Sequence, residues 1–293
     1  MNLFTGSGVA LVTPFGEDKS VDYEMLGRLI ERQVTEKTDA IIVCGTTGEP
    51  ATLTKEERDR VIRYTVKKVA HRIPVIVGTG SNCTQHAVES AKEAEQLGAD
   101  GILVVTPYYN KATQKGLFLH YQAVACATKL PIIIYNVPSR TGCNIKPDTI
   151  AKLVQEYPNI VGVKEASGDI SQVADLARLV GERIAIYSGN DDQILPILSL
   201  GGKGVISVLA NVVPRETHEL VMEYLQGNSQ KALELQLKFL PLVRQLFCEV
   251  NPIPVKAAME MIGYPCGMPR LPLTKLEEEH QKSLSQVIED LNI

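Results

Sequence analysis

The chain has no long hydrophobic run and no excess of one charge. Its longest apolar stretches, such as LPIIIYNV at residues 130–137, fall far short of the roughly 20 residues that a membrane-spanning helix needs. Lys and Arg total 30 against 34 Asp and Glu, for a formal net charge of −4 over 293 residues. This balance gives no basis for binding nucleic acid or an anionic membrane surface.

Clustered cysteines and histidines are also missing. The six cysteines include no Cys-x-x-Cys pair, and the five histidines show no ligand spacing with Cys, Asp or Glu. We therefore expect reduced thiols and no dedicated metal site. Residues 1–19 lack the basic segment that opens a signal peptide, and their apolar stretch runs into a Pro-Phe-Gly turn. These features predict a soluble, cytoplasmic protein.

What the sequence does contain is a regular series of short runs rich in Val and Ile. They span residues 8–15, 40–45, 74–80, 101–109, 131–138, 160–167, 184–191 and 204–211. Because the runs are nearly continuously apolar, they are typical of parallel strands that are covered on both faces.

The segments between the runs show helical periodicity and helix-start signals. In residues 21–37 the apolar side chains at helical spacing are Leu26, Leu29, Ile30 and Val34. A Thr followed three residues later by Glu forms a capping box, which predicts helix starts at Thr54 and at Thr274. Pro147 and Pro214 stand where first helical turns would begin.

Eight strand–helix units predict an α/β protein with a (β/α)8 TIM barrel. We expect the barrel in residues 1–227, and a C-terminal helical domain in residues 228–293 that packs on the barrel or at a subunit contact. A doubly wound open sheet is the alternative, but the first turn lacks the glycine fingerprint of that fold.

Lys164 follows the apolar residues Ile160, Val161 and Val163, where a buried strand should end, and lysine is rarely buried unless it is paired or functional. A free lysine has a pKa near 10.4, so about one in a few thousand is neutral at pH 7. An apolar barrel interior lowers that pKa, and a neutral lysine can form a Schiff base with a ketone without any cofactor. Neighbours on a strand face opposite sides, so Glu165 should not be its direct partner.

The carboxyl ends of barrel strands converge, so the residues at the ends of the runs or just after them should meet at one mouth. They are Thr46, Thr47, Tyr108, Tyr109, Tyr135, Arg140 and Lys164. Schiff-base formation expels water, and the hydroxyls of Tyr135 and Thr46 are candidates for the proton transfers. Arg140 is suited to clamp a substrate carboxylate. Each residue alone is equally compatible with a structural role; their convergence indicates a site.

Five motifs occur in order: GTTGE (45–49), TPYYN (106–110), YNVPSRTG (135–142), VKEASG (163–168) and NPIPVK (251–256). Together they resemble the dihydrodipicolinate synthase family of class I Schiff-base aldolases, over essentially the whole chain. The resemblance implies a lyase that condenses pyruvate with L-aspartate 4-semialdehyde, the first committed step of diaminopimelate and lysine biosynthesis. It implies no metal and no organic cofactor.

The resemblance also implies residue roles. Pyruvate would form its Schiff base on Lys164, with its carboxylate against Thr46 and Thr47. Tyr135, Thr46 and Tyr109 match the proton relay of the family, in which the second tyrosine comes from the neighbouring subunit. A dimer at least is therefore expected, and the usual assembly is a homotetramer, a dimer of dimers.

Arg140 matches the arginine that binds the carboxylate of the aldehyde, and Gly189 and Ile206 match pocket-lining positions. A related N-acetylneuraminate or 2-keto-3-deoxy sugar-acid lyase is the main alternative, which Arg140 and the GTTGE motif disfavour. A catalytically silent barrel would have lost the lysine or relay residues, which are present. An oxidoreductase would need a dinucleotide fingerprint, which is missing.

The sequence departs from the family at a cleft where many relatives bind the inhibitor lysine. Asn82 and Tyr108 match the lysine-sensitive pattern, whereas the remaining positions read Pro50, Lys55, Arg58 and His86. The carboxylate that would meet the ammonium of the ligand is missing, and two cations are added. The hypothesis is that lysine inhibits this protein weakly or not at all.

Overall fold

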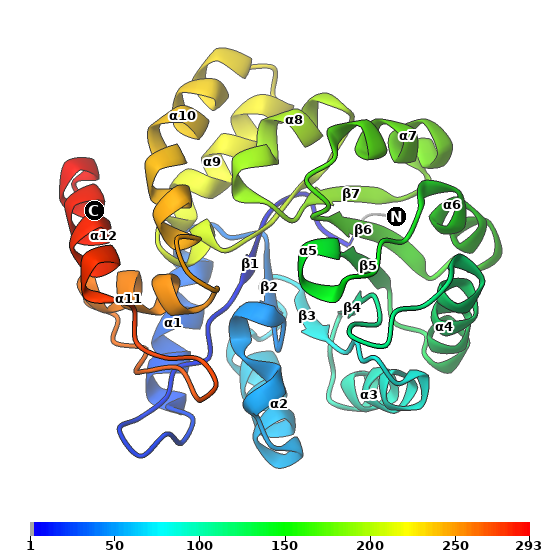
Figure 1. Ribbon diagram of the computed structural model, residues 1–293, viewed down its shortest axis with the longest axis horizontal. Helices are drawn as coiled ribbons and strands as arrows, with labels where there is room; N and C mark the ends of the chain where they lie inside the picture. The colour runs from blue at the N-terminus through cyan, green and yellow to red at the C-terminus, as the bar shows by residue number, and fades with distance from the viewer. Residues whose placement is uncertain (1–2) are drawn as a thin grey trace.

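The computed structural model describes residues 3–293, and a closed barrel of parallel strands forms its centre (Figure 1). The strands are β1 (Gly6–Ala10), β2 (Ala40–Val43), β3 (Val75–Gly78), β4 (Gly101–Val105), β5 (Ile132–Asn136), β6 (Ile160–Glu165), β7 (Ala185–Ser188) and β8 (Gly204–Ser207). Each strand pairs with the next, and β8 closes the barrel against β1. The predicted TIM barrel is confirmed.

A ring of helices surrounds the strands (Figure 1). Its members are α1 (Tyr23–Thr35), α2 (Lys55–Val69), α3 (Thr84–Gln96), α4 (Gln114–Ala127), α6 (Pro147–Glu156), α7 (Ile170–Val180), α8 (Ile194–Ser199) and α9 (Pro214–Leu225). Shorter helices are η1 (Thr46–Gly48), η2 (Pro50–Thr52), α5 (Pro138–Thr141), η3 (Gly181–Arg183), η4 (Asp191–Gln193) and η5 (Leu209–Asn211). The capping box at Thr54 and the first-turn prolines of α6 and α9 are as predicted.

The predicted strands extend further at their carboxyl ends than the strands of the structure. The run at 101–109 becomes β4, which stops at Val105, and the run at 8–15 becomes β1, which stops at Ala10. Leu11, Val12 and Thr106, just beyond these strands, are as buried as the strands themselves, so hydrophobicity could not mark the strand ends.

Side chains fill the barrel interior. The ring of Tyr187 stacks on Phe4 with centroids 4.3 Å apart, and its hydroxyl donates a hydrogen bond to the Phe4 carbonyl at 2.6 Å. Ile133 and Ile206 belong to the same buried cluster. The barrel is therefore a packed core, as expected for this fold, and the cavities described below lie at its mouth.

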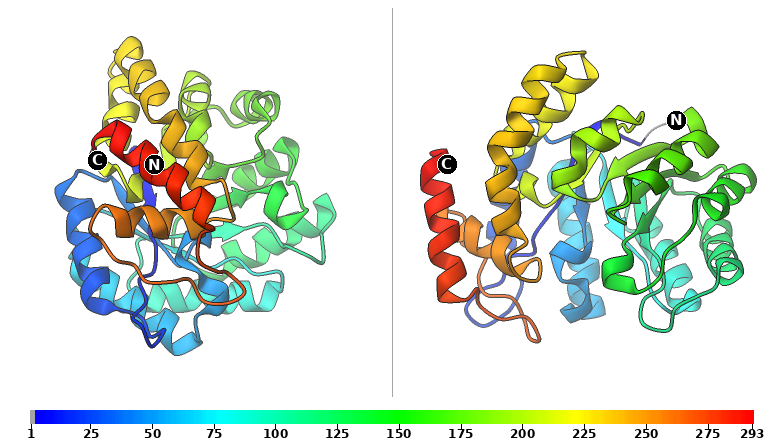
Figure 2. Two further views of the ribbon diagram at one scale, coloured as in Figure 1. Left: turned by 60° about the vertical axis from the view of Figure 1, so that its left-hand side comes forward. Right: turned by 45° about the horizontal axis from the view of Figure 1, so that its top comes forward.

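Helices alone form the C-terminal part: α10 (Ser229–Leu246), α11 (Ile253–Met261) and α12 (Glu278–Leu291). They pack along one side of the barrel, where α10 contacts α9 and α12 (Figures 1 and 2). One hydrophobic cluster includes Phe239 and Leu284 from these helices together with barrel residues, so the division at residue 227 stays a prediction. No helix within residues 3–293 is both long and apolar enough to cross a membrane.

The predicted helix start at Thr274 is wrong. The helix α12 begins at Glu278, four positions later, and Glu277 is its N-cap. The backbone N–H of Glu277 donates a hydrogen bond to the Glu249 carboxylate at 3.0 Å. A carboxylate distant in sequence therefore satisfies this helix end, which a local capping pattern could not reveal.

Candidate active site

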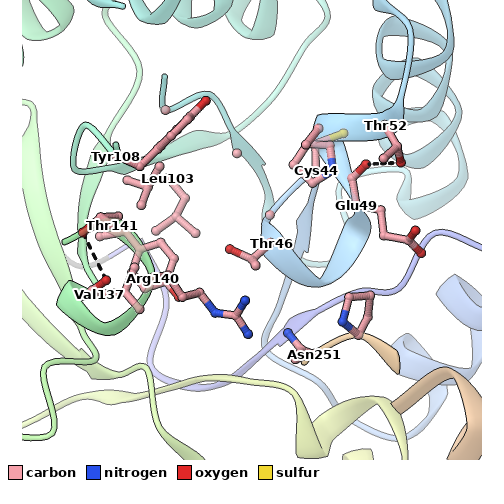
Figure 3. Close-up of a pocket in the computed structure, with 18 of the residues that line it drawn as sticks. Cys44, Thr46, Glu49, Thr52, Leu103, Tyr108, Val137, Arg140, Thr141 and Asn251 are labelled. Carbon is pink, nitrogen blue, oxygen red and sulfur yellow. Dashed lines mark hydrogen bonds between the residues drawn. The ribbon is translucent and has the colours of Figure 1, made fainter. Parts of the chain in front are cut away.

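Two adjoining cavities occupy the mouth of the barrel. The smaller, about 160 Å³, is lined by Lys164 and Gly189, and the larger, about 490 Å³, extends past Tyr108 to Arg58. Both cavities are lined by Gly45, Thr46, Leu103, Tyr135, Val137, Arg140 and Asn251. Figure 3 shows the Arg140 guanidinium pointing into the space between Thr46 and Asn251.

The register of β5 and β6 places Tyr135 beside Lys164. The Lys164 Nζ lies 4.3 Å from the centroid of the Tyr135 ring, and both residues are buried. Glu165 faces the other side of β6, where its carboxylate accepts hydrogen bonds from the Asn136 side chain at 3.1 Å and the Ser167 backbone at 2.8 Å. As predicted from strand alternation, Glu165 is not the partner of Lys164.

Burial in this apolar interior lowers the pKa of Lys164 to about 8, because the ammonium loses hydration there. The negative charge of Asp191 acts in the opposite direction, and the positive charge of Arg140 adds to the lowering. The amine is therefore neutral far more often at physiological pH than an exposed lysine.

Asp191 is the charged group near Lys164 that sequence reasoning missed. It follows β7 and is 2% exposed. Its Oδ2 accepts hydrogen bonds from the backbone N–H groups of Val208 and Leu209 at 3.0 and 2.9 Å. The Ser-Gly-Asn-Asp turn carried no signal that distinguished Asp191 from the exposed Asp192.

The Thr46–Thr47 turn lines the same smaller cavity as the lysine. The Thr47 Oγ1 accepts a hydrogen bond from the Asn251 side chain at 3.0 Å. Burial raises the pKa of Tyr135, while the Arg140 charge and the Thr46 hydroxyl oppose that rise. The phenol therefore stays protonated and can donate a proton to a group bound between it and the lysine.

The other predicted residues fall in three places. Gly189 lines the smaller cavity, where a Cβ would lie 3.1 Å from the Lys164 Cε and 2.6 Å from the Ala166 Cβ. Ile206 is buried in the barrel interior and lines neither cavity. Tyr109 is 90% exposed, outside both cavities of its own chain.

The site thus combines an amine of lowered pKa, a buried phenol, threonine hydroxyls and a guanidinium. This set can form a covalent imine, move protons to and from it, and bind carboxylates. Among residues 3–293 no group of three or more His, Cys, Asp or Glu side chains is arranged to hold a metal ion.

A TIM barrel whose mouth holds a buried lysine of lowered pKa beside a tyrosine places this protein in the class of aldolase-type lyases. The model of the Dihydrodipicolinate synthetase family matches residues 3–291, and the chain belongs to this family.

Relatives resemble the chain along its whole length. The 4-hydroxy-tetrahydrodipicolinate synthase of Caldicellulosiruptor bescii is 58% identical over 293 residues, which cover 100% of this chain and 99% of that protein. The crystal structure of dihydrodipicolinate synthase from Aquifex aeolicus is 49% identical, with a TM-score of 0.96 over 99% of this chain and 98% of that one. The synthase of Cyanidioschyzon merolae with lysine bound is 40% identical, with a TM-score of 0.97 over 100% and 99%.

Replacing Asp191 with Asn should lower the pKa of Lys164 further, because the charge that favours the ammonium is removed. Lysine reacts only in its neutral form, so labelling of Lys164 by acetic anhydride should rise with pH through about 8 in the wild type and at lower pH in Asp191→Asn. Peptide mass spectrometry at a series of pH values measures this midpoint.

Asp192→Asn is the matched control, because Asp192 is exposed on the same turn. It should leave the midpoint where it is in the wild type. Equal midpoints in Asp191→Asn and wild type would show that Asp191 does not act on the lysine.

Proposed function

We propose that this protein condenses pyruvate with L-aspartate 4-semialdehyde through a Schiff base on Lys164. The observation that carries the proposal is the burial of Lys164 at the barrel mouth, which lowers the pKa of its amine to about 8. Membership of the family and 58% identity to a 4-hydroxy-tetrahydrodipicolinate synthase support the substrates. A cytoplasmic location stays a prediction from the sequence.

In this mechanism the neutral Nζ of Lys164 attacks the ketone carbon of pyruvate, and the resulting carbinolamine loses water to give an iminium. Tyr135 supplies the proton for the departing water, and Thr46 connects it to the next proton carrier. The hydroxyls of Thr46 and Thr47 hold the pyruvate carboxylate.

The iminium then acts as an electron sink. The Tyr135 phenolate, left when its proton went to the departing water, takes a proton from the adjacent methyl group and gives an enamine. The enamine carbon attacks the aldehyde carbon of the second substrate and forms the C–C bond, and the alkoxide that results takes the proton back from Tyr135. The amino group of that substrate displaces Lys164, which closes the ring and frees the enzyme. Every electron pair comes from the two substrates and the lysine, so the sequence of steps needs no redox partner.

Arg140 favours the semialdehyde over a sugar-acid aldehyde as second substrate. Its side chain is exposed at the cavity rim on α5, and its guanidinium points into the cavity (Figure 3). A planar guanidinium matches a carboxylate through paired, charge-assisted hydrogen bonds. L-aspartate 4-semialdehyde carries a carboxylate three carbons from its aldehyde, at the end of a short, flexible chain.

An assay that couples product formation to NADPH oxidation by a reductase should show turnover with pyruvate and the semialdehyde. Lys164→Ala should lose more than about a thousandfold in kcat, because the nucleophile is gone. Arg140→Ala should raise the KM for the semialdehyde roughly ten- to a hundredfold, the range for a charge-assisted hydrogen bond.

Arg183→Ala is the control for Arg140→Ala, because Arg183 is an exposed arginine whose guanidinium donates hydrogen bonds to the backbone carbonyls of Leu179 and Val180 at the end of α7. It should behave as the wild type. Folded wild-type protein without turnover, or activity that survives in Lys164→Ala, would overturn the proposal.

Tyr109 supports an assembly in which each site takes a residue from a second subunit. Its side chain is 90% exposed and lies outside both cavities of its own chain, and its φ is 69°, an unfavourable conformation for tyrosine. A dimer in which Tyr109 completes the proton relay of the neighbour accounts for both features, and a homotetramer built from such dimers stays a prediction.

Mixing two inactive variants tests this arrangement. Lys164→Ala keeps Tyr109, and Tyr109→Phe keeps Lys164, so a mixed dimer has one complete site. Random mixing by co-expression should restore about a quarter of wild-type activity, because half of the dimers are mixed and each has one working site. If the co-expressed protein is no more active than the two variants expressed separately, Tyr109 acts within its own chain or takes no part in the reaction.

The cleft beside α2 supports weak or absent inhibition by lysine. The Lys55 ammonium lies 2.7 Å from the Glu93 carboxylate, and the Arg58 guanidinium lies 3.4 Å from the same group. The carboxylate of Glu93 is thus already paired with two cations of its own chain, and those cations repel the ammonium groups of lysine.

Exposed like charges weaken the binding of L-lysine to the cleft. At millimolar L-lysine, turnover in the coupled assay should therefore stay within about twofold of its uninhibited value. D-lysine at the same ionic strength serves as the control. Half-maximal inhibition by L-lysine in the micromolar range would contradict the expectation.

A further inference from the structure

A buried ion pair links the C-terminal helices to the Thr46–Thr47 turn. The Lys256 Nζ on α11 lies 2.7 Å from the Glu49 Oε1, and both side chains are almost completely buried, at 2% and 1% exposure. Glu49 closes the GTTGE motif and Lys256 closes the NPIPVK motif. The mechanism above uses neither residue.

Both oxygens of the Glu49 carboxylate are occupied by the C-terminal part of the chain. Oε1 pairs with Lys256, and Oε2 accepts a hydrogen bond from the Arg270 backbone N–H at 3.0 Å. The backbone of Glu49 is left-handed, with φ 54° and ψ 44°, which is unfavourable for a residue with a side chain. The two contacts therefore hold the turn in a conformation that it would not favour on its own.

Two neighbouring residues of the same turn are tethered as well. The Asn251 side chain donates a hydrogen bond to the Thr47 Oγ1 at 3.0 Å, and the Thr13 hydroxyl donates one to the Gly48 carbonyl at 2.8 Å. Three successive residues of the turn are thus fixed from outside it. Thr46, just before them, lines both cavities.

Stability alone is a poor explanation for this arrangement. A buried ion pair loses the hydration of both charges, so well-packed apolar residues of similar size often give equal or greater stability. The ion pair instead fixes the position of the Glu49 side chain, because a charge-assisted hydrogen bond has a stricter geometry than an apolar contact.

We propose that Glu49, Lys256 and Asn251 are positioning residues that hold the Thr46–Thr47 turn in the geometry that binds the pyruvate carboxylate. The inference rests on the proposed function. It assigns the C-terminal helices a part in substrate binding: they fix one wall of the site, although Lys256 and Glu49 transfer no proton to the substrate.

The test uses two independent variants of the full-length protein. Glu49→Gln with Lys256→Met removes both charges together, so that no unpaired charge remains buried, and Gln can still accept the Arg270 hydrogen bond. Asn251→Ala removes the second tether. Each should raise the KM for pyruvate roughly tenfold, the effect of a misplaced hydrogen-bond donor, with the KM for the semialdehyde within about threefold of wild type.

Matched controls come from the amino-terminal end of the barrel. Asn159→Ala removes an asparagine that donates to the carbonyls of Ala125 and Thr128, and His218→Gln removes the partner of Asp39. Both controls should keep the wild-type KM for pyruvate. Thermal unfolding of all variants shows whether a change in KM merely follows a loss of stability.

The outcomes separate the two proposals. Wild-type protein without turnover overturns the proposed function, and this inference with it. Wild-type turnover with an unchanged pyruvate KM in both network variants overturns only the inference. The network has a purely structural role if its variants raise the KM for pyruvate and the KM for the semialdehyde equally. The same holds if the control variants also raise the KM for pyruvate in proportion to their loss of stability.

Discussion

The burial of the Lys164 ammonium is the constraint on which the rest of the site depends. The closed barrel buries the end of β6, and the apolar side chains of the barrel interior offer the ammonium little replacement for its hydration. A pKa of about 8 leaves about one lysine in ten neutral at pH 7, against one in a few thousand for an exposed lysine. Tyr135 is placed beside the amine by the same strand pairing that closes the barrel. Fold and reactivity therefore have a common origin.

Lys256 shows that burial alone does not make a lysine reactive. It is as buried as Lys164, and burial also lowers its pKa, but the Glu49 carboxylate lies 2.7 Å away and favours the ammonium. Lys164 has no such contact in the described residues; Asp191 opposes the lowering of its pKa without a direct ion pair. The chain thus contains two buried lysines with different partners, one suited to attack a carbonyl and one suited to hold a turn in place.

The sequence predicted the features that repeat or that follow from strand alternation. The runs of Val and Ile identified all eight strands, and the position of Lys164 at the end of a run placed it at the mouth. Contacts between distant segments were not predictable. The Glu249 carboxylate that shifts the start of α12, and the pairing of Glu49 with Lys256 across 207 positions, leave no local pattern. Asp191 was not predicted, because the sequence does not show which of the two adjacent aspartates after β7 is buried and which is exposed.

The most direct test of the account is to identify the lysine that forms the imine. The protein is incubated with pyruvate alone, reduced with sodium borohydride and digested, and the modified lysine is located by mass spectrometry. We expect one pyruvate adduct per chain, at Lys164, with Lys256 and the exposed lysines unmodified. An adduct at Lys256, a spread over surface lysines or no adduct at all would contradict the claim that burial without a direct ion pair makes Lys164 the nucleophile.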